Sequence, residues 1–600
     1  MQNPQANSWS TLVELLQFRT VAQPHQDLYI FLKDDNVESG CLTYATLDRK
    51  ARAIAAYLQT QSVQPGQRVL LSYPLTEGLA FIAAFFGCLY AGAVVVTAWP
   101  PMNQSLSSEL QYKAADAAVS LGLTAQTLLA QIQTTFGQNP ELAHIPWLAT
   151  EPFSLDLAED WQAPELASHT LAYLQYTAGS TGIPKGAMIS HKNLLHNSAV
   201  IAHCFGATRD DRGVIWLPLY HDMGLIGGIL QPLYASFPVC LMSPLSFMRR
   251  PLRWLQAISH YRATISGGPN FAYELCIDKI KSADLKRLDL STWTIAFNGA
   301  EPVQARTLER FAAAFAPYQF RPEAFCPCYG MAETTVMAAS NLKLQTPQVL
   351  YLDPDALAQN QVRQIKEEQV AGLRVENRSA VSCGQAVLGQ QIRIVDPETC
   401  QPCSVDQVGE IWIAGDSVAQ GYWNNAEATA ATFQGCLANT GEGTFLRTGD
   451  IGFLASEQLY ITGRLKEVII IWGRNLYPQH LEQAIAQSHP AFAFSQGAAF
   501  SLEQDGQEQL VIVQEISRRS QHSAPLTDLV AIIQTTISQQ FLVEPQQIAL
   551  VKSGSIPKTP TGKVQRIHCR QQWRNGQLPV IHTWRQTISG GNIDWEAALA

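Results

Sequence analysis

Apolar and polar residues follow two different periods along the first 460 positions of the chain. Leu47 to Leu58 has apolar residues at helical spacing, whereas Arg68 to Tyr73 is a short apolar run of strand length. Further short apolar runs that end in polar residues or glycine occur at 213–217, 263–266 and 293–298. This alternation predicts an α/β fold in which parallel-rich sheets are flanked by helices.

One uncharged segment, from Leu79 to Trp99, is long enough to cross a membrane. However, Ala91-Gly92 interrupts it after a helix-like stretch, and the β-branched run Val94 to Val96 follows. A buried helix followed by a buried parallel strand explains both halves. We therefore expect no membrane span.

A second, smaller region begins near Lys466. The pattern predicts strands at 467–472 and 497–513 and helices at 478–487 and 527–540. We therefore expect a large N-terminal domain at 1–465 and a small α+β domain at 466–577, attached through Gly463-Arg464-Leu465-Lys466. Residues 578–600 have weaker periodicity and are predicted to be a tail or linker.

Composition narrows the class of protein. The 600 residues are 46% hydrophobic and carry a formal net charge of −9, which argues against a nucleic-acid binder. The N-terminus lacks a basic stretch followed by an apolar run, so we expect no secretory signal and a cytoplasmic location. The twelve cysteines show no zinc-site spacing and are expected to be reduced thiols.

The stretch Tyr176-Thr-Ala-Gly-Ser-Thr-Gly-Ile-Pro-Lys-Gly186 follows an apolar run that begins at Leu171. Its glycines permit tight turns, its hydroxyl groups can donate hydrogen bonds, and Lys185 supplies a positive charge. The spacing differs from the P-loop signature, because Lys185 is followed by glycine. The stretch is either a surface turn or a phosphate-binding loop, and we favour phosphate binding.

Six further segments carry candidate chemistry in a fixed order. They are Leu217 to Gly224 with His221, Asn298-Gly-Ala-Glu-Pro302, Tyr329-Gly-Met-Ala-Glu-Thr-Thr335, Arg447-Thr-Gly-Asp450, Gly463-Arg464-Leu465-Lys466, and Ile556 to Lys563. Several follow predicted strands, and ligands of open parallel sheets lie beyond the carboxyl ends of the strands.

Together the seven segments resemble the adenylate-forming superfamily, which includes acyl-CoA ligases, luciferases and the adenylation domains of peptide synthetases. The resemblance covers about residues 10–575. It implies that the chain uses ATP and Mg²⁺ to convert a carboxylate into an acyl-adenylate and pyrophosphate. Lys563, Lys185, Glu333 and His221 are then the catalytic set, with Glu333 also the Mg²⁺ ligand.

The same resemblance implies roles for the nucleotide-binding residues. The β- and γ-phosphates are assigned to Thr177, Gly179, Ser180, Thr181, Gly182 and Lys185. Adenine is assigned to Tyr329, which stacks on it, and to Asn298, Gly299, Ala300 and Glu301, with Gly330 and Met331 next to them. Thr334 is assigned to the α-phosphate, Asp450 to the ribose with Arg464 nearby, and Lys563 to both the carboxylate and the α-phosphate. The family usually has serine where Ala178 stands, so one hydroxyl donor is absent.

Each of these residues also has a structural explanation. Asp450 can cap a turn, Arg464 can form a surface ion pair, Glu333 can cap a helix, and His221 can be an ordinary strand-end histidine. Lys563 can belong to a solvated basic patch. The absence of an evident general-base dyad agrees with a reaction dominated by positioning and charge neutralisation.

Several phrases resemble the fatty acyl-AMP ligase branch, among them Trp216 to Gly227, Gly267 to Glu274 and Gly473 to Gln479. A long segment at about 340–380 corresponds to an insertion that in this branch interferes with the coenzyme A-dependent step, although it can also be a solvated loop. The resemblance implies transfer of the acyl group to an acyl carrier protein, for polyketide or lipopeptide synthesis. We find no carrier signature, so the carrier is expected in trans or as a downstream domain.

A fatty acid substrate requires an apolar channel. Candidate lining residues, which can equally be core, are Leu225, Ile226, Leu230, Phe247, Met248 and Phe271. Three alternatives stay open: an acyl-CoA ligase that uses free coenzyme A, a peptide-synthetase adenylation domain (with Asp222 as the residue that would hold an amino group), and a silent nucleotide-binding scaffold. The small domain is expected to rotate about Lys466 between the two half-reactions.

Overall fold

The computed structural model describes residues 9–178, 184–281, 285, 287–366, 379–471, 474–493, 495–504, 507–517, 524–559 and 562–586. A six-stranded sheet has the order β6-β5-β3-β4-β7-β8. Its strands are β6 (Trp147–Ala149), β5 (Leu121–Thr124), β3 (Arg68–Leu71), β4 (Val94–Thr97), β7 (Leu171–Ala178) and β8 (Pro184–Ser190). All neighbours are parallel except β7 and β8, which form a hairpin.

An eight-stranded sheet has the order β14-β13-β12-β11-β9-β10-β1-β2. Its strands are β14 (Ala339–Ser340), β13 (Phe325–Tyr329), β12 (Ile295–Asn298), β11 (Ile265–Gly268), β9 (Gly213–Ile215), β10 (Val239–Met242), β1 (Asp27–Leu32) and β2 (Glu38–Thr43). The six central strands are parallel, and each edge strand is antiparallel to its neighbour. The predicted parallel-rich α/β fold is therefore confirmed.

The main core lies between these two sheets, because one hydrophobic cluster joins side chains of β3 and β4 to side chains of β9 and β10. Helix α3 (Gly78–Tyr90) is buried within it and leads into β4, which confirms the helix-and-strand interpretation of the uncharged segment. Within the described residues, no helix combines the length and apolarity needed to span a bilayer. The predicted cytoplasmic location stays a prediction.

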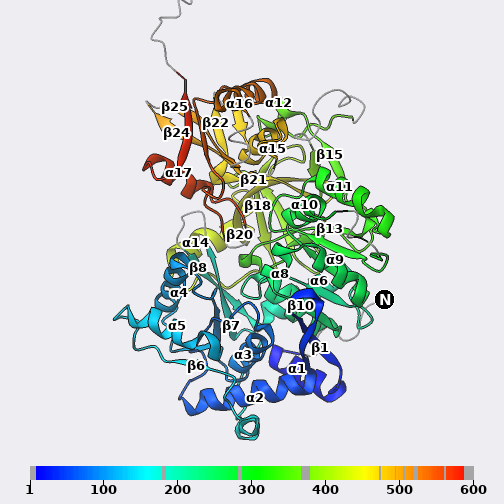
Figure 1. The fold of residues 1–600 in the computed structure, drawn as a ribbon, viewed down its shortest axis with the longest axis vertical. Coiled ribbons are helices and arrows are strands. Elements are labelled where there is room, and N and C mark those ends of the chain that lie inside the picture. The colour runs from blue at the N-terminus through cyan, green and yellow to red at the C-terminus, as the bar shows by residue number, and fades with distance from the viewer. Residues whose placement is uncertain are drawn as a thin grey trace, which may run out of the picture.

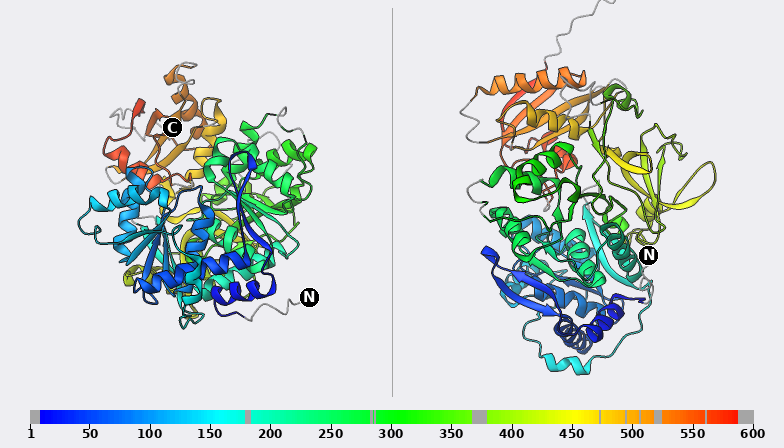
Figure 2. Two further views of the ribbon diagram at one scale, coloured as in Figure 1. Left: turned by 60° about the horizontal axis from the view of Figure 1, so that its bottom comes forward. Right: turned by 90° about the vertical axis from the view of Figure 1, so that its right-hand side faces the viewer.

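Helices accompany the strands throughout this part of the chain (Figures 1 and 2). They are α1 (Leu12–Ala22), α2 (Tyr44–Thr60), α4 (Gln104–Asp116), α5 (Gln126–Gly137), α6 (His191–Phe205), α7 (Gln231–Ala235), α8 (Pro244–Arg249), α9 (Leu252–Tyr261), α10 (Asn270–Lys279), α11 (Ala305–Phe315), α12 (Pro354–Leu357) and α14 (Ala426–Phe433). Helix α11 shows the sequence logic well, since Leu308, Phe311 and Phe315 recur at helical spacing and are buried.

A third sheet follows, with the order β17-β18-β20-β19 and β21 paired to β20. Its strands are β17 (Gln391–Val395), β18 (Gly409–Ala414), β19 (Gly435–Cys436), β20 (Gly443–Ala455) and β21 (Gln458–Arg464). The expected insertion at about 340–380 contains the small antiparallel pair β15 (Val349–Tyr351) and β16 (Ser379–Val381), with α12 between them. Residues 367–378 lie outside the described part.

From residue 466 onward the chain stacks on one end of the molecule, shown in orange and red in Figure 1. It contains the hairpin β22 (Ile469–Ile471) and β23 (Arg474–Leu476), α15 (Pro478–Ser488), α16 (Leu526–Phe541) and α17 (Arg566–Arg574). Its sheet has the order β24-β25-β26-β27, formed by Gly497–Gln504, Gln507–Ile516, Gln547–Lys552 and Val580–Arg585.

The assignment of residues 578–600 to a tail was wrong for β27. This strand pairs in an antiparallel manner with β26, from Gln547↔Arg585 to Val551↔Val580. It is an edge strand, so only Ile581 and Trp584 pack on the core while its other side chains remain polar or exposed. A strand buried on one side for only part of its length gives a weak hydrophobic signal, which explains the error.

Candidate active site

The predicted site residues gather at the carboxyl ends of the parallel strands. Asn298 is the last residue of β12 and Tyr329 the last of β13, while Thr177 lies near the end of β7. His221 follows β9 after a short connection. Strands β9, β12 and β13 are parallel in the eight-stranded sheet, so their carboxyl ends lie at one edge. The end of β7, in the six-stranded sheet, meets this edge through the hydrogen bond from Thr177 to Glu333.

Asp450 connects three of the predicted segments. Its Oδ2 accepts a hydrogen bond from the Tyr329 hydroxyl at 2.9 Å, and its Oδ1 accepts one from Arg464 Nε at 2.8 Å. The Asp450 side chain is 12% exposed, so this is a largely desolvated ion pair. Each carboxylate oxygen has two acceptor sites, and the geometry therefore leaves room for further donors such as ribose hydroxyls.

Asn298 is fully buried, and its side-chain oxygen Oδ1 is unsatisfied within the described residues. Its amide nitrogen donates to Asn270 Oδ1 at 3.4 Å, but no donor of the described residues reaches the oxygen. An unpaired buried acceptor is costly, so it points to a group that binds there. The adjoining turn is tight: Ala300 has a φ of 69°, and Glu301 accepts the Phe271 N–H at 2.6 Å. Burial raises the pKa of Glu301.

Glu333 lies in a short 3₁₀ segment (Ala332–Thr334) and is 5% exposed. Its Oε1 accepts a hydrogen bond from the Tyr422 hydroxyl at 2.7 Å and a longer one from Thr177 Oγ1 at 3.4 Å. Burial raises the pKa of Glu333, and the Tyr422 hydrogen bond opposes this rise. Lys185, the cross-strand neighbour of Thr177, has its Nζ 5.0 Å from the centre of the Tyr422 ring.

The hydroxyl of Thr334 already has local partners. It donates to the Met331 carbonyl at 2.9 Å and accepts the Met331 N–H at 3.2 Å. Gly330 is required by close packing, since a Cβ there would lie 1.9 Å from the carbonyl oxygen of Val336. These contacts fix the backbone that carries Glu333, while the predicted contact of Thr334 with the α-phosphate stays a prediction.

His221 forms a pair with its neighbour: its Nδ1 lies 2.7 Å from Asp222 Oδ1. Burial lowers the pKa of His221, but the negative charge of Asp222 and its hydrogen bond together outweigh burial, so the net shift is upward. A π-helix, Met223–Leu230, begins directly after this pair. Irregular helices of this kind occur frequently at functional sites.

Lys563, from the C-terminal region, lies within electrostatic range of these residues. The positive charge of Arg464, followed by burial, lowers its pKa to about 8, while Asp450 and Glu467 oppose the shift. In turn, the charge of Lys563 lowers the pKa of Glu301 and of His221. The structure thus brings Lys563 into the electrostatic field of four residues from the first 464 positions.

Part of the predicted set lies outside the described residues, namely Gly179, Ser180, Thr181 and Gly182. Of the proposed channel residues, Leu225, Ile226, Leu230 and Phe247 are fully buried in the main core, and Met248 is 41% exposed. Phe271 is partly buried against Trp216. The channel therefore stays a prediction. Tyr422 was missed, since Gly421-Tyr422-Trp423 is only a weak aromatic signal until its contacts with Glu333 and Lys185 are seen.

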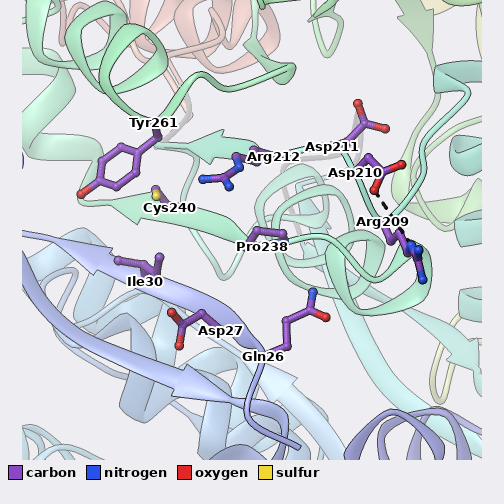
Figure 3. Close-up of a pocket in the computed structure, with 11 residues that line it drawn as sticks. Gln26, Asp27, Ile30, Arg209, Asp210, Asp211, Arg212, Pro238, Cys240 and Tyr261 are labelled. Atoms are coloured by element: carbon purple, nitrogen blue, oxygen red, sulfur yellow. Dashed lines mark ion pairs between the residues drawn. The ribbon is translucent and has the colours of Figure 1, made fainter. Parts of the chain in front are cut away.

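A cavity of about 480 Å³ lies elsewhere. It is lined by Asp27, Arg212, Pro238, Cys240 and Tyr261, among others, at the amino-terminal ends of β1, β9 and β10 (Figure 3). None of the predicted site residues lines it. Its walls mix acidic and basic side chains, and it is on the opposite edge of the sheet from the candidate site.

The insertion contacts the C-terminal region directly. Arg474 Nη2 donates to Asp355 Oδ1 at 2.7 Å. The Asn475 N–H donates to the Ala358 carbonyl at 2.9 Å, and its side-chain amide reaches the oxygens of Ala358 and Asn360 at 3.2 Å each. Tyr477 shares a hydrophobic cluster with Leu352 and Leu357 of the insertion. The two regions are therefore tied together in this arrangement.

Comparison with known proteins adds independent information. Residues 18–423 match the family model described as AMP-binding enzyme, and residues 466–583 match a model described as Disco-interacting protein 2-like, AMP domain. The chain is 44% identical over 577 residues to the medium-chain-fatty-acid–[acyl-carrier-protein] ligase JamA of Moorena producens (95% of this chain, 96% of the relative). It is 35% identical to the putative fatty-acid–CoA ligase FadD21 of Mycobacterium tuberculosis (95% and 99%).

A solved structure is also similar. It is the fatty acyl-adenylate ligase of Legionella pneumophila in complex with acyl adenylate and pyrophosphate. The TM-score is 0.74 at 37% identity, covering 98% of this chain and 99% of the other.

Proposed function

This chain belongs to the AMP-binding enzyme family, and we propose that it joins a fatty acid to AMP and then passes the acyl group to the phosphopantetheine thiol of an acyl carrier protein. The observation that carries the proposal is the convergence of Lys563, Arg464 and Asp450 at the carboxyl edge of the sheets, next to Glu333 and His221. A scaffold that only bound nucleotide would not need a lysine held there from a separate region of the chain.

The first half-reaction brings two anions together. A carboxylate oxygen of the fatty acid attacks the α-phosphorus of ATP, the bond to the β-phosphate oxygen breaks, and pyrophosphate leaves. No proton has to move, so positioning and neutralisation of charge account for the catalysis. Lys563 is the residue we assign to the carboxylate and the α-phosphate, and Lys185 to the outer phosphates.

The other residues orient the nucleotide. Asp450 binds the ribose hydroxyls, held in place by Arg464 and Tyr329, and the unpaired Oδ1 of Asn298 accepts from the adenine amino group. The ring of Tyr329 lies against the base. His221, paired with Asp222, lies beside the carboxylate.

Glu333 is the residue that would hold Mg²⁺. Among the described residues no three His, Cys, Asp or Glu side chains cluster as a metal cage. Mg²⁺ does not need one, since it usually binds one or two carboxylates together with substrate phosphates and water. One oxygen of Glu333 is held by Tyr422, so the site fits. When bound, the ion neutralises phosphate charge.

In the second half-reaction the thiol sulfur attacks the acyl carbonyl carbon, the bond to AMP breaks, and the thiol proton is released. The contacts between the insertion and residues 474–477 support a carrier protein over free coenzyme A, because the insertion of the fatty acyl-AMP ligase branch interferes with the coenzyme A-dependent step and here it packs directly on the C-terminal region. The name of JamA gives an acyl carrier protein as the acceptor for that relative, which supports a carrier for this chain. The name of FadD21 gives coenzyme A instead.

The decisive experiment follows both products. The enzyme is incubated with ATP, Mg²⁺ and saturated fatty acids from C6 to C18, and pyrophosphate and acyl-AMP are quantified. Coenzyme A and a phosphopantetheinylated carrier protein are then supplied in parallel. We expect acyl-AMP with both acceptors, with thioester forming mainly on the carrier and only a trace of acyl-CoA. Abundant acyl-CoA would refute the carrier assignment, and absence of acyl-AMP would refute the whole proposal.

A further inference from the structure

Lys563 lies in a turn whose two arms, residues 557–559 and 562–565, are described on either side of residues 560–561. The Thr559 N–H donates to the Lys563 carbonyl at 2.8 Å, and the Lys563 N–H donates to Thr559 Oγ1 at 3.1 Å. Below this, the Gln565 N–H donates to the Pro557 carbonyl at 2.9 Å, and Lys558 is bridged to Val564. The two arms of the turn are thus joined, and the position of Lys563 depends on how the base of the turn is held.

Arg566 lies at that base, where α17 begins, and is 8% exposed. Its Nε and Nη2 donate to the two carboxylate oxygens of Glu482 at 2.7 and 2.6 Å, and its Nη1 donates to Glu467 Oε2 at 2.7 Å. The side chains of Glu482 and Glu467 are 14% and 11% exposed. A bidentate, desolvated arginine–carboxylate pair fixes direction as well as distance.

The two carboxylates come from elements that define the orientation of the C-terminal region. Glu482 is on α15, and its Oε1 also accepts the Ala499 N–H of β24 at 2.9 Å. Glu467 belongs to the 3₁₀ segment Leu465–Glu467, which directly follows Arg464 of the site. In Figure 1, α17 lies on the side of this sheet that is nearer to α14. Arg566 therefore connects the turn of Lys563 to the segment that joins the two parts of the chain.

We propose that Arg566 is a positioning residue for adenylation: its ion pairs with Glu467 and Glu482 hold the turn so that the Lys563 ammonium group reaches the carboxylate and α-phosphate. This rests on the proposed function. The electrostatics agree with this, because Glu467 raises and Arg566 lowers the pKa of Lys563, so both members of the ion pair act on its ammonium group. A displacement of about 1 Å in such a group costs up to about 100-fold in rate.

The test is a double-mutant cycle on the full-length enzyme. Pyrophosphate release is measured with ATP, Mg²⁺ and dodecanoate for Arg566→Lys, Lys563→Ala and the double variant. We expect Arg566→Lys to lower kcat by about 10- to 100-fold with little change in the KM for ATP. If Arg566 acts through Lys563, the double variant is no slower than Lys563→Ala alone.

The other outcomes are equally informative. A purely structural role reduces the fraction of active enzyme, so the double variant would be slower than Lys563→Ala by the same factor as the single change, and this would overturn the proposal. Arg574→Lys, at the exposed end of the same helix, is the matched control and leaves kcat unchanged. If Lys563→Ala itself retains full activity, the proposed function of Lys563 is refuted. This outcome is distinguishable from failure of the Arg566 proposal alone, in which Lys563→Ala is slow and the double variant is slower still.

A second variant covers the case in which Arg566→Lys does not fold. Glu467→Gln keeps the size and an oxygen acceptor but removes the charge that pairs with Arg566. We expect it to lower kcat by about 10-fold, again without a further decrease in the Lys563→Ala background. Calorimetric titration with ATP confirms the number of intact sites. An unchanged kcat in a folded Glu467→Gln protein would refute the positioning role of the Arg566 ion pairs.

Discussion

The hydroxyl of Tyr422 offers the sharpest test of the phosphate end of the site. The change Tyr422→Phe removes the 2.7 Å hydrogen bond to Glu333 and keeps the ring, which lies near Lys185 and packs against Phe433 at 5.1 Å. A hydrogen bond to a charged group contributes about 1.5–3 kcal/mol, and the other hydroxyl contact of the buried Glu333, from Thr177, is longer at 3.4 Å. The carboxylate therefore loses most of its orientation.

Two results follow from that loss. Partners that orient a metal ligand typically change metal affinity by 10- to 100-fold, so the Mg²⁺ concentration for half-maximal pyrophosphate release rises by about that factor. Because the Tyr422 hydrogen bond lowers the pKa of Glu333, its removal also lets this pKa rise, and the defect becomes larger at lower pH. Both effects are read from Mg²⁺ titrations at two pH values with saturating ATP.

A matched control is available in the same chain. The Tyr261 hydroxyl also donates to a glutamate, Glu38, at 2.8 Å, but at the opposite edge of the sheet beside the cavity of Figure 3. Tyr261→Phe is expected to leave the Mg²⁺ dependence unchanged. If Tyr422→Phe also titrates like the native enzyme at both pH values, the assignment of Glu333 as the Mg²⁺ ligand is refuted.

Three further predictions concern the C-terminal region. Lys563→Ala lowers acyl-AMP formation by about 100- to 1,000-fold, since a preorganised charge is lost, whereas exposed Lys558→Ala does not; comparable rates in the two variants would count against the assignment. The kcat/KM for ATP falls above about pH 8, because the pKa of Lys563 is about 8 and the protonated form is the active one; a value that still rises at pH 9 would contradict this. The double change Asp355→Ala with Asn475→Ala removes side-chain ties between the insertion and β23, and acyl-CoA formation rises about two- to fivefold, consistent with the small free energy of exposed contacts. Unchanged coenzyme A turnover would show that these ties do not limit rotation.

Much of the site was predictable because its residues follow recognisable local patterns. Asn298 and Tyr329 each end an apolar run, and strand ends at one edge of a parallel sheet have to lie close together. The uncharged segment at 79–99 was resolved correctly because Ala91-Gly92 separates two periodicities. Such signals need only a few neighbouring residues to be visible.

The parts that were missed depend on partners distant in sequence. Tyr422 matters because Ala187 of β8 bridges to it and so places its hydroxyl at Glu333, 89 positions away. The strand β27 exists because β26 offers it a free edge, not because of its own pattern. Leu225 and Leu230 are buried in the main core, and their apolar character alone did not distinguish core from channel lining, so the channel stays a prediction.

The sequence by itself determined the α/β class, the order of the chemical segments and the residue types that a phosphoryl-transfer site needs, because these are local properties of short stretches. Only the tertiary structure decided which charges meet. Arg464 and Asp450 face each other across β20 and β21, and the turn of Lys563 is held by Arg566, 84 residues from Glu482 and 99 from Glu467. The strength of those interactions depends on burial and distance, and both arise only when the chain is folded.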